Sequence, residues 1–181
     1  MAGLVSESSK RSENTIPNFL APDTPPNRLD TLGELAYRIT PFFVINKSTI
    51  IQAFTQNFGL KDKAERSYAQ LTSAKKRNRF TDRLNHRWDS VLDMKHLVQI
   101  GPSEDHAEAI QKLLNFRAND LCYTISNYSK LDDQFFPFQQ IFAQIYAQGM
   151  GTILLNLSGD TLFLDTEMHR APAVRFIGRK R

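Results

Sequence analysis

Residues 152–165 read TILLNLSGDTLFLD and contain the strongest structural signal in the chain. Two runs of β-favouring residues, 152–157 and 161–165, flank a short connection that contains Gly159. A glycine in so short a connection is typical of a tight hairpin, so we predict two adjacent antiparallel strands. A further β-favouring run at residues 173–177 predicts a third strand close behind them.

The chain upstream of the hairpin extends this sheet. Residues 121–126 form a short apolar run bounded by polar residues, which favours a strand over a helix. Pro137 is suited to the first turn of a helix, and apolar residues at helical intervals follow it as far as Gly149 or Gly151. The C-terminal part is therefore predicted as strand, helix, strand, strand, strand, in a small and largely antiparallel sheet crossed by the helix at 137–148.

The N-terminal half is predicted to be mostly helical. Apolar residues recur at three- and four-residue intervals over residues 29–39, which predicts a first helix. A second helix is expected to be capped by Asn46 or Ser48 and to stop at Gly59 in a left-handed conformation.

Two further helical segments complete this half. Residues 62–92 continue the helical pattern, as one long helix or two. The break at Gly101 and Pro102 is followed by Ser103, which is expected to cap another helix that runs through Leu114. The fold class predicted for the whole chain is α+β.

Length and composition agree with one such domain. The chain has 181 residues, of which 41% are hydrophobic and 23% charged, as in an ordinary globular protein. Residues 1–27 are rich in Ser, Pro, Asn and charged residues, which predicts a disordered tail. We expect a single α+β domain over residues 28–181, with a helical part at 28–118 and a sheet part at 119–181.

The compartment can also be predicted. Cys122 is the only cysteine, so an internal disulfide is excluded and a reducing compartment is the simpler interpretation. The sequence has no signal-peptide pattern at its start and no run of about 20 apolar residues, the length that spans a bilayer. We therefore expect a cytoplasmic protein that does not insert into a membrane; its oligomeric state is left open.

Residues 75–88 contain the most distinctive functional pattern, with six Lys and Arg residues and a single acid. On a helix, the apolar side chains of this stretch form one stripe and the basic side chains form the next. The candidate binding residues on the basic stripe are Lys75, Lys76, Arg79, Arg83, His86 and Arg87.

Four of these residues are spaced four apart and would form a ridge along one helix. Four residues of helix rise about 6 Å, close to the spacing of successive phosphates on a nucleic-acid strand. The pattern therefore predicts a non-catalytic protein that contacts an anionic partner, above all a nucleic-acid backbone, with little sequence specificity. The other interpretation is a solvated helix face that Glu65, Asp89 or Asp93 neutralises in three dimensions.

The rival functional class is a protein-interaction module, such as an adaptor or inhibitor of a larger protein. The chain contains 13 Phe, including residues 42–43 and the run Phe135-Phe136-Pro137-Phe138. Aromatic side chains in excess of the core would form a partner surface, although a core position is the simpler explanation. A net charge of +4 also makes an acidic protein surface a plausible partner.

Catalytic signals are weak. Cys122 has apolar neighbours and no adjacent base, so we expect an inert core cysteine. The acidic group Asp160, Asp165 and Glu167, with His169, has the residue types for a metal-dependent nuclease, although water-exposed loop positions are the simpler interpretation. No zinc ligand spacing, glycine-rich phosphate loop or nucleophile elbow is present, so we predict no catalytic residue, metal site or cofactor.

Overall fold

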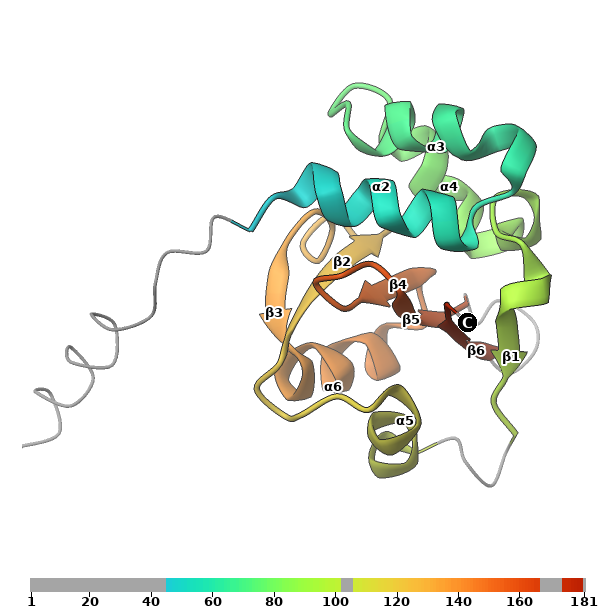
Figure 1. The fold of residues 1–181 in the computed structure, drawn as a ribbon. Coiled ribbons are helices and arrows are strands. Elements are labelled where there is room, and N and C mark those ends of the chain that lie inside the picture. Colours follow the sequence, from blue (N-terminus) through green and yellow to red (C-terminus); the bar gives the residue numbers. More distant parts are fainter. Residues whose placement is uncertain (1–44, 102–105, 167–173, 181) are drawn as a thin grey trace, which may run out of the picture. The chain divides into compact units, whose positions relative to one another are not determined.

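The computed structural model describes residues 45–101, 106–166 and 174–180. These residues form an α+β fold with five α-helices and a six-stranded sheet in the order β1-β6-β5-β4-β2-β3, all neighbours being antiparallel (Figure 1). The predicted fold class is confirmed. The predicted tail at 1–27 and the predicted helix at 29–39 lie outside the described residues.

The predicted strands are present, together with two short ones. The sheet consists of β1 (Leu97–Gln99), β2 (Leu121–Ser126), β3 (Phe135–Pro137), β4 (Thr152–Leu155), β5 (Thr161–Asp165) and β6 (Arg175–Arg179). The hairpin prediction is confirmed, with Leu154 of β4 opposite Phe163 of β5. Gly159 has a φ of 68°, which a glycine adopts without strain.

The helix predicted at 137–148 is confirmed, whereas the helical segments predicted at 62–92 and before Leu114 are shorter than the sequence pattern suggested. The helices are α2 (Lys47–Phe58), α3 (Ala64–Leu71), α4 (Asn78–His86), α5 (Ala107–Leu114) and α6 (Phe138–Gln148), with short 3-10 helices η1 (Lys61–Lys63), η2 (Trp88–Ser90) and η3 (Met94–His96). The segment predicted at 62–92 is thus broken several times. Its longest helix has 9 residues.

The helix ends confirm some of the predicted caps and correct two. The helix that runs through Leu114 is capped by His106, whose Nδ1 accepts from the Ala109 N–H at 3.3 Å, and not by Ser103, which lies outside the described residues. The side chain of Asn46 accepts a hydrogen bond from the Ser48 backbone N–H at 3.0 Å and begins α2, as predicted. Gly149 ends α6 in a left-handed conformation, with φ of 59°. Gly59 does not adopt that conformation: its φ is −73° and its ψ 153°, so the chain leaves α2 extended. A glycine is needed there for space, because an added Cβ would lie 2.5 Å from the Thr55 carbonyl oxygen.

Helices cover the sheet on both faces. Figure 1 shows α2, α3 and α4 on one side and α5 and α6 on the other. Successive side chains of a strand point to opposite faces, so Ile153 and Leu155 of β4 join the core under α2, α3 and α4, and Leu154 joins the core with α5 and α6. All residues of β4 are buried. The central strands therefore lie between two hydrophobic cores.

A buried ion pair holds the turn between α3 and α4. Arg77 precedes α4 and is only 6% exposed. Its Nε and Nη2 donate to the two carboxylate oxygens of Asp132, at 2.6 and 2.8 Å, and its Nη1 donates to the Leu71 carbonyl at 2.7 Å. Asp132 lies in the connection between β2 and β3, and it also accepts from the Ser126 N–H at 3.0 Å. The pair thus ties the helical layer to the sheet.

We expect Arg77→Ala to lower the free energy of unfolding by about 3–5 kcal/mol, because it leaves the Asp132 carboxylate without its buried partner. Urea denaturation followed by circular dichroism would measure the change. Lys76→Ala is the matched control, since Lys76 is an exposed neighbour and its loss should change stability by less than about 0.5 kcal/mol. Equal stability of the two variants would contradict a structural role for this pair.

Candidate anion-binding surface

The predicted basic ridge is divided among three structural settings. Lys75 and Lys76 lie in the turn before α4 and are exposed. Arg79, Arg83 and His86 lie on α4 itself. Arg87 follows the last helical residue and has a non-helical φ of −144°. The candidate residues therefore do not form one continuous helical ridge, because the helix spans only Asn78–His86.

Arg83 is the best anchored of these cations. Its Nε donates to the Arg79 carbonyl at 2.8 Å, and its Nη2 donates to the side-chain oxygen of Gln70 on α3. Its guanidinium also lies 5.7 Å from the centre of the Phe80 ring. Arg83 thus bridges α4 to α3 and holds its charge in a fixed place.

Two further arginines surround this anchor. The pKa of Arg83 is lowered, first by its partial burial and then by the positive charges of Arg66 and Arg87. Arg66 belongs to α3, one helical turn before the Gln70 that holds Arg83. Arg66 is not among the residues predicted from the sequence, because only the packing of α3 against α4 brings it to the basic stretch. We call Arg66, Arg79, Arg83 and Arg87 the arginine surface.

The acids that the sequence offered to neutralise this surface form no ion pair with it. Glu65, Asp89 and Asp93 form no ion pair with the arginine surface, or with Lys75 and Lys76, within residues 45–101, 106–166 and 174–180. In that part of the chain the Asp side chains that do pair with cations are Asp132, Asp133 and Asp165. The arginine surface is therefore an accumulation of positive charge.

The suggested acidic metal group is not assembled by its described members. Asp165 is fully buried and accepts from Arg175 Nε at 2.9 Å. Asp160 directly precedes β5, whereas Asp165 is the last residue of that strand. The Asn156 side chain donates a hydrogen bond to the Asp160 carboxylate at 2.6 Å and lowers the pKa of Asp160. Glu167 and His169 lie outside the described residues. Among the residues that the structure describes, no group of three or more His, Cys, Asp or Glu side chains is placed to hold a metal ion.

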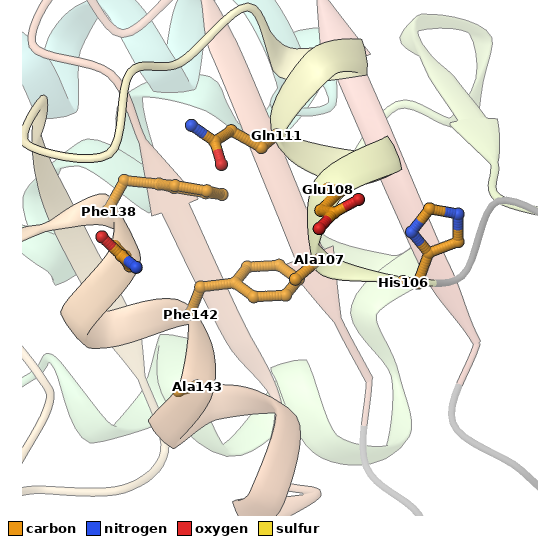
Figure 2. Close-up of a pocket in the computed structure, with 8 residues that line it drawn as sticks. His106, Ala107, Glu108, Gln111, Phe138, Phe142 and Ala143 are labelled. Atoms are coloured by element: carbon orange, nitrogen blue, oxygen red, sulfur yellow. The ribbon is translucent and has the colours of Figure 1, made fainter.

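The aromatic run at residues 135–138 packs against the two hydrophobic cores. Phe138 is buried, and the half-buried Phe135 and Phe136 pack against different cores. Residues 42–43 lie outside the described residues. Phe138 and Phe142 line a hollow of about 680 Å³ between α5 and α6. Figure 2 shows their rings projecting from α6 toward the α5 side chains.

The large exposed apolar side chains of the described residues are not aromatic. They are Met94, Val98, Leu113, Leu121 and Leu157. The aromatic surface that would mark a protein-interaction module is therefore not visible in this part of the chain.

Comparisons with known proteins give no relative. The chain matches no family model, no curated protein and no solved structure. None of the helices in the described part of the chain has the length and apolar character required to cross a bilayer.

Cys122 lies in the core, as predicted, and is 1% exposed. Burial, together with the negative charge of Asp120, raises its pKa to about 12. Only the thiolate is nucleophilic, and at pH 8 about one thiol in ten thousand is ionised for such a pKa.

We therefore expect iodoacetamide to modify Cys122 at least about 100-fold more slowly in the folded protein than in urea, as followed by mass spectrometry. Ser129→Cys in a Cys122→Ala background supplies an exposed control thiol, which should react at similar rates in both states. Rapid labelling of folded Cys122 would contradict the assignment of an inert core thiol.

Proposed function

We propose that this protein is a non-catalytic binder of nucleic-acid backbone, which it contacts through the arginine surface of α3 and α4. The observation that supports the proposal is the cluster around Arg83. Arg66 and Arg87 lie close enough to Arg83 to lower its pKa, and no described acid pairs with any of the three. Bringing like charges together opposes folding, and an anion bound across them removes that repulsion.

The chemistry of the cations favours phosphate. A guanidinium group presents a planar fork of N–H donors that matches the oxygens of a phosphate, and it stays charged at any physiological pH. Arg83 is fixed in place by Gln70, whereas Arg79 and Arg87 are exposed beside it. Lys75 and Lys76, also exposed, continue the positive charge into the turn before α4.

Low sequence specificity follows from the same geometry. Exposed arginines on the outer side of a helical pair reach phosphates, which are alike at every base pair. Binding of this kind releases counterions, so the affinity falls steeply as salt is added. The proposal thus predicts a salt-sensitive protein that binds duplexes of different sequence almost equally.

The decisive variant reverses Arg66, Arg79 and Arg87 to Glu and keeps Arg83, whose contacts with Gln70 and Phe80 support the helical pair. We expect it to lose at least about tenfold in affinity for a fluorescein-labelled 20-base-pair duplex at low salt. The slope of log K against log salt should also become shallower by about 1 for each phosphate contact removed. Fluorescence anisotropy measures both quantities.

The matched control reverses three exposed cations elsewhere, Lys112, Arg117 and Lys130, and so changes the net charge equally. It should keep most of the affinity, because none of the three lost charges belongs to the arginine surface. Equal losses in the two triple variants would show that net charge alone attracts the duplex. Absence of binding by the unaltered protein, even at low salt, would reject the proposal.

A further inference from the structure

A second group of cations lines a hollow at one end of the sheet, which we call the sheet-end pocket. It has a volume of about 760 Å³. Its charged and titratable lining residues come from η1, η3 and the end of β6, and they are Lys61, Lys95, His96, Arg179 and Lys180. This size falls within the range of about 300–1,000 Å³ that is usual for small-molecule sites.

The pairing of β1 with β6 creates this cluster. Leu97 lies opposite Gly178, so the residues that precede β1 and those that follow Gly178 meet at the same end of the sheet. The end of α2 is held nearby, because the Asn57 side chain donates to the Gly159 carbonyl at 3.0 Å. The Lys180 N–H in turn donates to the Asp160 carbonyl at 2.9 Å. The pocket therefore rests on backbone contacts rather than on flexible side chains alone.

The lining contains no carboxylate. Its remaining residues are the polar Gln56 and Asn57 and the apolar Val98 and Ile177, which are direct cross-strand neighbours. No ion pair involves its Lys or Arg residues within the described part of the chain. The C-terminal end of α2 supplies only about half a negative charge. That partial charge offsets a small share of four cations.

The guanidinium of Arg179 is less free than the three lysine side chains to contact a ligand in the pocket. Its Nη2 donates to the Leu113 carbonyl of α5, which holds the guanidinium toward the other helical layer. Lys61, Lys95 and Lys180 come from separate parts of the chain, and the ends of their flexible side chains can converge on one anion. The lysines are therefore the residues to test.

We propose that the sheet-end pocket binds a compact ligand that carries two or more phosphate groups and an apolar or planar body. The three lysines contact the phosphates, and Val98, which is 67% exposed, offers the body an apolar contact beside Ile177. A free nucleoside triphosphate and the phosphorylated end of a nucleic-acid strand share this chemistry. The inference goes beyond the proposed function, because none of the pocket residues belongs to the arginine surface.

The test is isothermal titration of the full-length protein with ATP, tripolyphosphate and adenosine at near-physiological salt. We expect ATP to bind most tightly, tripolyphosphate more weakly because it lacks the body, and adenosine not at all. Reversal of Lys61, Lys95 and Lys180 to Glu should weaken ATP binding by more than about tenfold. The reversal of Lys112, Arg117 and Lys130 should leave it unchanged.

Competition then distinguishes the two sources of the ligand. If an oligonucleotide with a 5′-triphosphate displaces ATP and its 5′-hydroxyl counterpart does not, the pocket accepts a strand end; if neither displaces it, the pocket is a nucleotide site. The inference is overturned if ATP does not bind, or if the lysine variant binds it as well as the unaltered protein while retaining the same circular dichroism spectrum.

The same titrations keep the two proposals separate. The variant with Glu at 66, 79 and 87 should still bind ATP, and the lysine variant should still bind a duplex with 5′-hydroxyl ends. Loss of ATP binding with normal duplex binding after the lysine change supports the pocket independently. Duplex binding that fails in the unaltered protein, with ATP binding intact, would reject only the proposed function.

Discussion

The burial of β4 and β5 on both faces is the constraint on which the rest of this structure depends. Every residue of β4 is buried, as is every residue of β5 after Thr161. Each fully buried Leu, Ile or Phe side chain contributes about 1.5–3 kcal/mol, and because such side chains point to both faces of these strands, both faces must be shielded from water. Antiparallel strands often leave one face in water, so these strands require two helical layers. The helices α2, α3 and α4 form the layer on one face of the sheet, and α5 and α6 form the layer on the other face.

This two-sided burial also explains why the basic stretch at 75–88 is split. The helical layer must be attached to the sheet, and Arg77 makes that attachment through Asp132. Its side chain therefore turns inward, while Arg79, two residues later, points to solvent. Short helices joined by a fixed turn are the result. Positive charges at neighbouring positions thus occupy two environments, one inside the fold and one on its surface.

The sequence predicts the elements whose signals are local. The hairpin at 152–165, the strand β2 and the Asn46 cap each depend on residues within a few positions of one another, and all three are found. The strands β1 and β3 have three residues each, too few for an alternating pattern to be recognised. They exist because β6 and β2 offer them hydrogen-bonding edges.

The errors on the candidate surface have the same origin in long-range contacts. The break before α4 depends on the bond between Arg77 and Asp132, which lies 55 residues further along the chain. The apolar periodicity within residues 62–92 therefore could not predict it. Arg66 joins the arginine surface only through the packing of α3 on α4. The left-handed conformation predicted for Gly59 was also wrong, because the chain is extended at Gly59 and pairs there with Leu92. Local chemistry identified the basic segment, and tertiary contacts decided which of its cations face outward.

The cations of the described residues are sorted by burial. Buried Arg77 and partly buried Arg175 each face an aspartate, as the cost of burying a charge demands. Half-buried Arg83 meets the neutral amide of Gln70, so its charge is held in place and not cancelled. Exposed Arg79 and Arg87 have no carboxylate partner among these residues. The inner cations therefore contribute to the stability of the fold, and the outer ones remain exposed to solvent.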